Sequence, residues 1–273
     1  MEQLNLISNK TKTEIAIDFI REHEPEEGYF VGFSGGKDSV VVLDLVQRAG
    51  VKHQAYYSAT GIDPPELVKY INEHYPYVIQ KRPLLTRKRA HPDWEGVRSF
   101  YGMIKHLGFP TRTQRWCCDV LKKDPTKKVP LLHRIMGLRA EESSMRAKRG
   151  QISYFKKLKQ WEYKPIFTWL EWEIWDYIES NKLPYCSLYD EGFDRLGCVV
   201  CPFICHGIRG KLKISMERWP KHYASFEKAM LELFNNYLCV INPRSGGWNY
   251  RNETDFQEFL LNWYHGVSDK TNR

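Results

Sequence analysis

The sequence has no long apolar run. None of its stretches approaches the roughly 20 consecutive apolar residues that a membrane-spanning helix requires, and residues 1–5 are polar, unlike the start of an export signal. We therefore expect a soluble, cytoplasmic protein with no membrane partner. The seven cysteines do not favour a disulfide framework in that compartment, where grouped thiols are more typical of metal or sulfur chemistry.

The sequence also shows no signature of a known nucleic-acid-binding module, although the chain is basic. It has 41 Lys and Arg against 33 Asp and Glu, and its net charge of +8 favours polyanionic partners. Residues 81–91 form one basic run, and a second contains Lys122, Lys123, Lys127 and Lys128. Such runs usually lie on solvated surface, so nucleic-acid contact is their less frequent interpretation.

The ordinary nucleotide loop is missing as well. That loop requires four residues between its first glycine and a Gly-Lys pair, with Ser or Thr after the lysine. Here three residues separate Gly32 from Gly36, and Asp38 follows Lys37. A different turn joins the apolar runs at 29–33 and 40–43, and its sequence is Ser34-Gly35-Gly36-Lys37-Asp38-Ser39.

This turn predicts a phosphate-binding loop between a strand and a helix. Its glycines let a phosphate approach the backbone, and the helix offers unpaired N–H groups and the positive end of its dipole. Ser34 and Ser39 add hydroxyl donors, and Lys37 adds a point charge. Asp38 is the nearest carboxylate for a metal ion. A purely structural glycine turn is the alternative interpretation.

Helical and strand patterns alternate along the rest of the chain, which is long enough to bury a core, with 273 residues of which 42% are hydrophobic. Helices are predicted at 12–23, 39–48 and 64–74, and a further helix is predicted after a capping box of Thr168 and Glu171. Strands are predicted at 29–33, 53–58 and 133–138. This order predicts an α/β fold with a Rossmann-like, doubly wound, mostly parallel sheet. We expect a nucleotide-binding domain over 1–210 and a helical C-terminal extension over 211–273.

Four cysteines form two pairs. Cys117 and Cys118 are adjacent, and Cys198 and Cys201 have the Cys-x-x-Cys spacing that lets two thiolates converge on one metal or cluster. Adjacent cysteines are unusual for zinc, because neighbours on a helix point about 100° apart. An iron-sulfur cluster, a zinc ion, and redox or buried thiols all remain open from the spacing alone.

The loop resembles a known family. Residues 34–39 are similar to the pyrophosphate-binding loop of the adenine nucleotide alpha hydrolase (PP-loop) superfamily, which includes ATP pyrophosphatases and the PAPS and APS reductases. With the other segments, the resemblance to the PAPS and APS reductases covers roughly residues 25–205. It implies that the chain binds ATP or an adenosine sulfonucleotide through Ser34, Gly35, Gly36, Lys37, Asp38 and Ser39, together with Mg²⁺.

Two further segments are similar to nucleotide-contacting segments of the reductases. Thr60 and Gly61, followed by a proline and Glu66, resemble the segment after the second strand. Residues 137–146 resemble the stretch that closes over the nucleotide, in which Arg139 and Arg146 would clamp phosphate oxygens. The resemblance thus adds Thr60, Gly61 and Arg139 to the expected nucleotide contacts.

Four of the cysteines add to this resemblance. Cys117, Cys118, Cys198 and Cys201 are similar to the 4Fe-4S ligand set of APS reductases and of the related DNA phosphorothioation ATP pyrophosphatase. The reductases also carry a catalytic cysteine in a Glu-Cys-Gly-type motif on a C-terminal tail, whereas no cysteine follows Cys239 here. The remaining cysteines are Cys186 and Cys239, which fit a core, and Cys205, which is either a sulfur-carrying thiol or a buried residue.

We therefore expect an ATP pyrophosphatase that adenylates an acceptor oxygen so that sulfur can later displace AMP, as in nucleic-acid thiolation or DNA phosphorothioation. Its catalytic residues would be Lys37, Asp38, Arg139 and Arg146. DNA or RNA is the expected acceptor, and a cysteine desulfurase the expected sulfur donor. The alternatives are a sulfonucleotide (PAPS or APS) reductase and a cluster-bearing nucleic-acid-binding subunit.

Overall fold

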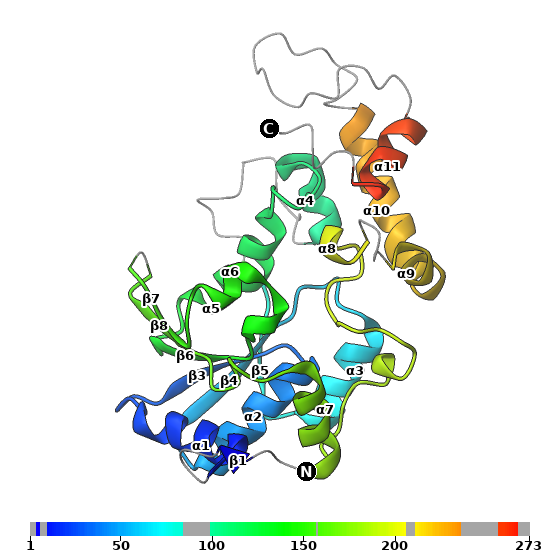
Figure 1. The fold of residues 1–273 in the computed structure, drawn as a ribbon. Helices are drawn as coiled ribbons and strands as arrows, with labels where there is room; N and C mark the ends of the chain where they lie inside the picture. The colour runs from blue at the N-terminus through cyan, green and yellow to red at the C-terminus, as the bar shows by residue number, and fades with distance from the viewer. Residues whose placement is uncertain are drawn as a thin grey trace. The chain divides into compact units, whose positions relative to one another are not determined.

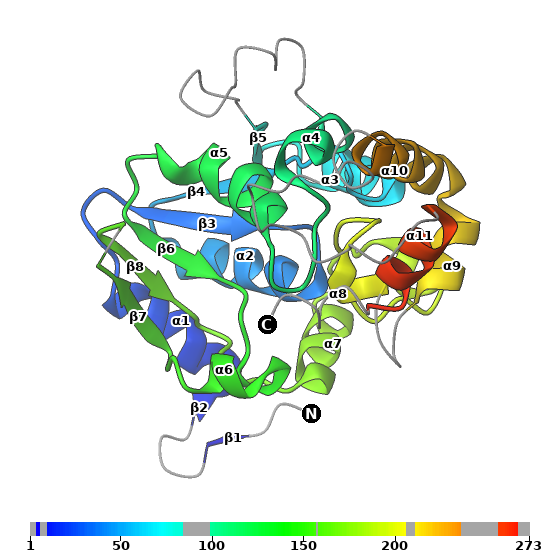
Figure 2. The ribbon, with the colours of Figure 1, turned by 90° about the horizontal axis from the view of Figure 1, so that it is seen from above.

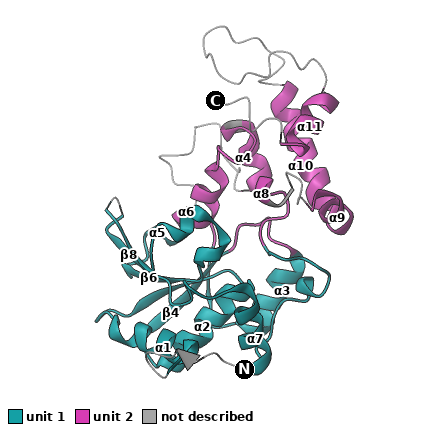
Figure 3. Ribbon diagram, viewed as in Figure 1, with its two compact units in different colours: residues 1–58, 65–81, 126–196 teal, residues 59–64, 82–125, 197–273 magenta. Residues whose placement is uncertain are grey.

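The computed structural model describes residues 4–5, 10–83, 99–156, 158–205, 211–235 and 256–266. The chain forms two compact units (Figure 3), of which the first comprises residues 1–58, 65–81 and 126–196 and the second comprises 59–64, 82–125 and 197–273. The boundary that the sequence suggests near residue 210 does not separate them, because the segments 59–64, 82–125 and 197–205 group with the C-terminal helices.

The first unit is built on a six-stranded sheet with the order β5-β4-β3-β6-β8-β7 (Figures 1 and 2). Neighbouring strands run parallel except for β7, which is antiparallel to β8. The described strands are β1 (Leu4–Asn5), β2 (Lys10–Thr11), β3 (Tyr29–Phe33), β4 (His53–Ser58), β5 (Ile79–Lys81), β6 (His133–Met136), β7 (Ile152–Phe155) and β8 (Gln160–Tyr163). This arrangement confirms the predicted mostly parallel α/β sheet.

The order in which the chain adds strands to the sheet changes direction at β3. From β3 it proceeds outward to β4 and β5 and then returns to β6, on the other side of β3. The register places Val31 opposite both Ala55 and Ile135. Ligands of open parallel sheets bind beyond the carboxyl ends of the strands at such a reversal. In this unit that edge lies just beyond Phe33 and Met136.

Helices α1, α2 and α7 lie together on one face of the sheet (Figure 1). The helices that belong to the first unit or lead into it are α1 (Lys12–Glu22), α2 (Lys37–Ala49), α3 (Pro65–His74), α5 (Asp124–Lys127), α6 (Ser144–Ala147) and α7 (Glu171–Ser180). Thr11 and Glu14 form a capping box at the start of α1. The apolar run at the start of α2, residues 40–43, is buried and forms part of the core.

The predicted capping box of Thr168 and Glu171 is wrong. Tight turns occupy the residues before α7, since the N–H of Phe167 donates to the carbonyl of Lys164 and that of Trp169 to the carbonyl of Ile166. The helix therefore begins later, at Glu171. Its capping carboxylate is Glu173, which accepts the N–H of Leu170 at 2.7 Å.

The second unit is helical and has an aromatic core. Its described helices are α4 (Phe100–Leu107), α8 (Pro202–Cys205), α9 (Leu212–Arg218), α10 (Pro220–Leu233) and α11 (Phe256–Tyr264). Helix α10 contacts α4, α9 and α11. Phe226 on α10 packs between Phe100 and Trp263, with ring centroids 6.3 and 4.5 Å away. Among the described residues, no helix combines the length and apolar character needed to cross a membrane.

Candidate functional site

The phosphate loop follows β3 at the reversal point of the sheet. Helix α2 begins at Lys37, and its N-cap, Gly36, supplies no side-chain cap to the first turn. Gly35 has a φ of +73°, and a Cβ at this position would lie 2.7 Å from Leu67 Cδ1 on α3. Glycine is therefore required at Gly35, and the start of α2 retains backbone N–H groups that can bind an anion.

The two serines of the loop have different roles. The hydroxyl of Ser39 donates to the carbonyl of Gly36 at 2.8 Å, and Ser39 Oγ accepts the N–H of Ser34 at 3.2 Å. Ser39 is buried, whereas Ser34 is exposed. The buried serine thus holds the loop in shape, and Ser34 is the serine positioned to reach a ligand.

Lys37 is almost fully buried, with 5% of its surface exposed. Its Nζ donates to the carbonyl of Asp194 at 2.8 Å and pairs with Glu171 Oε1 at 3.2 Å. The same ammonium lies 5.3 Å from the ring centroid of Tyr189 and 6.0 Å from that of Trp175. A buried ammonium held by aromatic rings and one carboxylate is a preorganised cation beside the loop.

Tyr189 reaches the loop from a 3₁₀ turn, Ser187–Tyr189. Its Oη accepts the backbone N–H of Lys37 at 2.9 Å, which is one of the N–H groups that a phosphate would use. Burial raises the pKa of Tyr189, so its hydroxyl stays protonated. Tyr189 therefore occupies an anion-binding position at the start of α2.

Asp38 and Arg139 connect the two strand ends. A Cβ on Gly137, just after β6, would lie 2.9 Å from the carbonyl oxygen of Asp38, so these backbones approach closely. Arg139 is 3% exposed, and its Nε donates to Asp38 Oδ1 at 2.5 Å. Burial opposes the charge on Arg139, but the carboxylates of Asp38 and Glu141 outweigh it and raise the pKa of Arg139. The carboxylates of Asp38 and Glu141 hold the guanidinium of Arg139 in a fixed position next to the loop.

Arg146 is placed differently from Arg139. Its guanidinium pairs with Glu142, which lies four residues earlier. Glu142 in turn accepts the N–H of Arg139 at 3.1 Å. In the described part of the chain, the ion-pair partner of Arg146 is therefore this glutamate and not a loop residue. Its assignment as a phosphate clamp stays a prediction.

The predicted nucleotide contacts Thr60 and Gly61 belong to the second unit. Thr60 is buried, and its hydroxyl and N–H both donate to Asp63 Oδ2, at 2.8 and 3.0 Å. Its Oγ1 also lies 3.9 Å from Cys198 Sγ. Gly61 has a φ of +80° and is exposed. Thr60 is thus a neighbour of the cysteines, and the role of both residues in nucleotide binding remains a prediction.

The four predicted cysteine ligands interact with one another in the second unit. They carry free thiols, and Cys198 is 8% exposed. The pKa of Cys117 is raised by its hydrogen bond with Cys118, by burial, and by the nearby thiols of Cys198 and Cys201. Four sulfurs from two distant segments therefore share one neighbourhood. We refer to Cys117, Cys118, Cys198 and Cys201 as the cysteine group.

Two basic side chains face the cysteine group. Cys118 begins a π-helical turn, Cys118–Lys123, which also carries Lys122; π-helical turns are frequent at functional sites. Arg115 Nη2 donates to Cys118 Sγ at 3.6 Å. The hydrogen bond from Cys117 and then the Arg115 guanidinium lower the pKa of Cys118 to about 5. The neighbouring Cys198 and Asp63 raise the pKa of Lys122.

The chemical types of these four donors suit a thiolate-bound cluster, but their positions in this structure do not form a metal site. Four cysteines without a histidine are the usual ligands of a 4Fe-4S cluster, and the cations Arg115 and Lys122 offset the negative charge of such a centre. Within the described ranges, no three His, Cys, Asp or Glu side chains are gathered closely enough to hold one metal ion. Cys186 is buried in the first unit. Cys239 and residues 84–91 of the basic run lie outside the described residues.

Residues 28–203 match the family model of the phosphoadenosine phosphosulfate (PAPS) reductase domain. The chain belongs to this family. Its segments from the phosphate loop to Cys201 all lie inside the matched region of the PAPS reductase domain. Curated relatives of the family include PAPS reductases and APS reductases, which are enzymes.

Three relatives of this PAPS reductase-domain chain have sequence identities to it of 16% to 33%. An uncharacterised protein of Methanocaldococcus jannaschii is 33% identical over 80% of this chain and 45% of that protein. An adenosine 5'-phosphosulfate reductase of Shouchella clausii is 27% identical over 71% of this chain and 80% of the reductase. The crystal structure of a PAPS reductase from Candida auris, a phosphate complex, has a TM-score of 0.51 and 16% identity, covering 71% of this chain and 90% of that one. That structure supports the fold. The chain spans 45% and 46% of the lengths of two M. jannaschii relatives.

The structure adds residues that sequence reasoning missed. Tyr189 and Glu171 both contact Lys37, although the sequence pattern assigned Glu171 only to a helix cap, and Tyr189 lies 152 residues from the lysine whose N–H it accepts. The sequence gives a weak indication that Lys122 lies near the cysteine group, because Lys122 is one helical turn beyond Cys118. Arg115 had none beyond its closeness to the Cys-Cys pair.

Proposed function

We propose that the chain uses ATP to adenylate an acceptor oxygen, releasing pyrophosphate, and that it thereby prepares a nucleic acid for sulfur insertion. The observation that carries this proposal is the charge arrangement at the sheet edge. Lys37, buried beside the start of α2, and Arg139, buried on the neighbouring strand end, supply two fixed cations around one glycine loop. Two cationic side chains that are held beside a helix N-terminus would both contact the phosphates of ATP.

The loop residues would act on the leaving group. The acceptor oxygen attacks the α-phosphorus of ATP and forms a new P–O bond, while the bond to the pyrophosphate oxygen breaks and its electrons leave with pyrophosphate. The N–H groups at the start of α2 and the Ser34 hydroxyl would hold the β- and γ-phosphates. Lys37 and Arg139 would stabilise the charge that develops on pyrophosphate, and removal of one such donor typically costs about 10²–10³ in kcat.

Asp38 is the residue that would hold Mg²⁺. Its Oδ1 accepts from Arg139, whereas its Oδ2 accepts no hydrogen bond from the described residues. A half-paired carboxylate at the first turn of α2 fits a hard cation that also binds phosphate oxygens. When bound, the ion neutralises charge on the phosphates of ATP.

The cysteine group would hold the 4Fe-4S cluster. Cys117, Cys118, Cys198 and Cys201 are the ligands, and Arg115 and Lys122 offset their charge. When bound, such a cluster supplies either a structural cross-link between the two segments or a site that carries sulfur. A cysteine desulfurase is the proposed source of that sulfur.

The test uses protein purified without oxygen. Pyrophosphate release from ATP is measured with tRNA or duplex DNA as acceptor, and sulfite release from APS and PAPS is measured with thioredoxin as reductant. We expect pyrophosphate that depends on nucleic acid and on Lys37, with Lys37→Ala inactive and Lys69→Ala, an exposed lysine of α3, fully active. Sulfite release without pyrophosphate would overturn the proposal.

The second candidate is a sulfonucleotide reductase. The match to the PAPS reductase domain and the reductases among the relatives favour it. In that case the loop would hold the phosphate or sulfate of the nucleotide, and sulfite would be released only with a thiol reductant. A third possibility, a nucleic-acid-binding subunit, predicts ATP-independent binding of DNA or RNA that Lys37→Ala leaves unchanged.

A further inference from the structure

The first unit carries a β-hairpin at the outer edge of its sheet, formed by β7 and β8 (Figures 1 and 2). The register places Tyr154 on β7 directly opposite Trp161 on β8, and their ring centroids lie 4.7 Å apart. Tyr154 is 45% exposed and Trp161 is 40% exposed. Two large aromatic rings therefore stand next to each other on the surface. We refer to Tyr154 and Trp161 as the aromatic pair.

The aromatic pair is exposed because α1 covers only part of this face of the sheet. Side chains alternate along a strand, so Trp161 and Tyr163 point to the same face. Tyr163 is 6% exposed, and it packs against the rings of Phe19 and His23 on and after α1, with centroids 6.4 and 5.7 Å away. Trp161, two residues nearer the tip of the hairpin, is left uncovered.

The aromatic pair has surface and polar groups that a ligand could use. A cross-strand aromatic contact stabilises a hairpin by itself, yet here it leaves both rings partly in water. Within the described residues, Trp161 Nε1 and Tyr154 Oη make no hydrogen bond. Leu132, whose carbonyl accepts the N–H of Trp161 at 3.0 Å, is 41% exposed and extends the apolar surface. Exposed apolar patches of this kind mark interaction sites.

The segment that contains the aromatic pair is cationic. Residues 146–161 include six Lys and Arg and no Asp or Glu. Exposed cations of this segment include Lys148, Arg149, Lys156 and Lys159. Glu162 follows Trp161, but it points to the opposite face of β8 and pairs with Lys164 at 3.2 Å. The charge of the hairpin therefore favours a polyanionic partner over an acidophobic or basic one.

Lys159 carries its charge at a backbone position that does not favour lysine. Its φ is +52°, in the left-handed region. Glycine or asparagine usually holds such a position in a hairpin turn, because other residues are strained there. The conformation of the turn therefore does not explain why a lysine is present.

We propose that the aromatic pair and the lysines beside it bind unpaired bases of an RNA acceptor. Bases stack on Tyr154 and Trp161, and Lys156 and Lys159 contact the neighbouring phosphates. Sequence-specific RNA recognition mostly targets unpaired loops and ends, whose bases stack on aromatic side chains. A duplex keeps its bases stacked inside the helix, so it could use only the lysines.

The aromatic pair lies away from the phosphate loop. Trp161 is level with His133 at the start of β6. The loop follows β3, whose Gly32 is level with Met136 at the end of β6. The two sites are thus separated by about 10 Å along the strands and about 10 Å, or two strand spacings, across the sheet. The hairpin would hold bases that flank the reacting nucleotide, and the inference rests on the proposed function only in taking RNA as the acceptor.

RNA binding is measured by fluorescence anisotropy on the full chain without ATP. The probe is a labelled single strand of A and C, which cannot pair with itself, and the comparison is the same strand annealed to its complement. We expect the single strand to bind about tenfold more tightly, in line with the contribution of one stacked base. Equal binding of the two probes would show that only charge is recognised and would overturn the proposal. Tighter binding of the corresponding DNA strand would overturn it as well.

Variants of Trp161 test the stacking. Trp161→Ala should weaken binding of the single strand about tenfold and leave binding of the duplex unchanged. Trp161→Phe keeps an aromatic ring and should bind nearly as the wild-type chain does. Melting temperatures check that both variants fold. Unchanged single-strand binding in Trp161→Ala would contradict the proposal.

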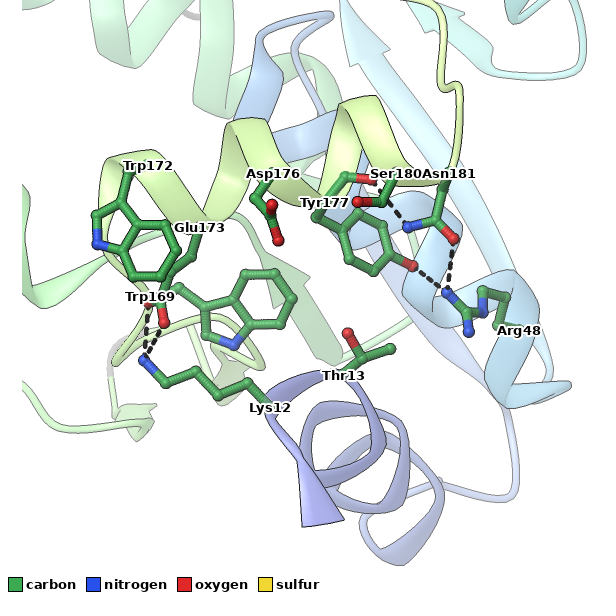
Figure 4. A pocket seen from close by; sticks show the side chains of 10 residues that line it. All are labelled: Lys12, Thr13, Arg48, Trp169, Trp172, Glu173, Asp176, Tyr177, Ser180 and Asn181. Carbon is green, nitrogen blue, oxygen red and sulfur yellow. Dashed lines mark hydrogen bonds and ion pairs between the residues drawn. The ribbon is translucent and has the colours of Figure 1, made fainter. Parts of the chain in front are cut away.

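The matched control is Trp172→Ala. Trp172 is 50% exposed on α7 of the same unit and lines a cavity of about 350 Å³ (Figure 4). That cavity offers no comparable stacking surface, because its other indole, Trp169, is 3% exposed, and its Lys12 already pairs with Glu173 at 2.6 Å. Trp172→Ala should therefore leave RNA binding unchanged. A loss as large as that of Trp161→Ala would overturn the assignment to the hairpin.

Lys159→Gly separates the charge from the fold. It should lower the slope of log affinity against log salt by about 0.7, the value for one phosphate contact on a single strand. Its melting temperature should stay the same or rise, because glycine adopts a positive φ without strain. Lys69→Gln, which removes an exposed charge from α3, should leave the slope unchanged. An unchanged slope in Lys159→Gly would overturn the assignment of this lysine to the phosphates.

Pyrophosphate release on the same samples separates this inference from the proposed function. If Trp161→Ala weakens RNA binding while the wild-type chain releases no pyrophosphate, the aromatic pair stands and the proposed activity fails. If pyrophosphate release depends on RNA while RNA binding does not depend on Trp161, the activity stands and this inference fails. Self-association of the chain that Trp161→Ala abolishes would assign the surface to a second copy and overturn the proposal.

Discussion

Around the phosphate loop, the charged groups already have partners of opposite charge: Lys37 pairs with Glu171, Asp38 with Arg139, and Arg146 with Glu142. Around the cysteine group, by contrast, the pKa of Cys117 is raised by its hydrogen bond with Cys118 and by burial, and the pKa of Cys198 is raised by burial, which Lys122 offsets only in part. The loop is therefore shaped before any ligand arrives. In the cysteine group, the cations Arg115 and Lys122 favour the thiolate form of Cys118 and, in part, that of Cys198.

The difference follows from how each region is assembled. The loop is one contiguous segment at the junction of a strand and a helix, so local hydrogen bonds such as Ser39 to Gly36 give it its shape. The cysteine group joins segments that lie far apart in the sequence, and a bound cluster would contribute part of the energy that holds them together. We therefore expect that a substitution that disrupts one of these two regions leaves the other intact.

The largest effect is expected from Cys198→Ser. Cys198 is buried in the group, and removal of one thiolate should reduce iron and sulfide from about four atoms each per chain to near zero. ATP binding should persist, because the loop does not depend on the cluster. Iron and sulfide analysis and ATP dialysis on the same sample measure both properties.

The control for this variant is Cys186→Ser, since Cys186 is also buried but lies in the first unit. It should retain iron. Full iron content in Cys198→Ser, or loss of iron in both variants, would contradict the assignment of the cysteine group.

Arg139→Gln should have the next largest effect. It removes the guanidinium that pairs with Asp38 and, under the proposed mechanism, should lower pyrophosphate release by about 10²–10³. Removal of one partner of a buried pair also destabilises the fold by about 3 kcal/mol. Arg146→Gln, whose arginine pairs with Glu142 on the same short stretch, should cost less than about 1 kcal/mol. Urea unfolding and steady-state assays of both variants test this ranking, and equal losses would refute it.

Gly35→Ala tests the loop without changing a charge. The new Cβ would approach Leu67 and Ile71 within 2.9 Å and would also sit at a φ of +73°, so we expect a loss of about 2–4 kcal/mol and of ATP binding. Gly50→Ala has nearly the same φ, +72°, but meets nothing within 4 Å. Its cost should be about 1 kcal/mol, from backbone strain alone. A similar loss of stability at both positions would show that Leu67 and Ile71 shift to make room for the new Cβ.

Tyr189→Phe should have the smallest effect. Without nucleotide, the loss of the hydrogen bond from the Lys37 N–H should cost about 0.5–1.5 kcal/mol. With saturating ATP the cost should shrink, because a phosphate oxygen replaces the tyrosine hydroxyl at that N–H. Thermal unfolding with and without ATP measures the difference. An equal loss in both states would show that the phosphate does not bind at that N–H.

Much of the first unit could be predicted, because its signals are local. The strand at 53–58, the capping box of Thr11 and Glu14, and the glycine that ends α2 all depend on residues within a few positions of one another. The start of α7 could not be predicted, because tight turns that end at Phe167 and Trp169 occupy the residues that the pattern assigned to a helix cap. Thr60 likewise follows a correctly predicted strand but bonds to Asp63 and approaches Cys198.

Residue types at short, regular spacing predicted the parallel α/β fold, which the sheet confirms, and they also predicted the phosphate loop and the four thiols of the proposed cluster. Only the tertiary structure decided that Tyr189 occupies the N–H of Lys37, that Arg139 and not Arg146 pairs with Asp38, and that Trp169, Asp176 and Arg48 surround one cavity. These contacts join residues that are distant along the chain. Their geometry follows from strand order and helix packing, which no local pattern encodes.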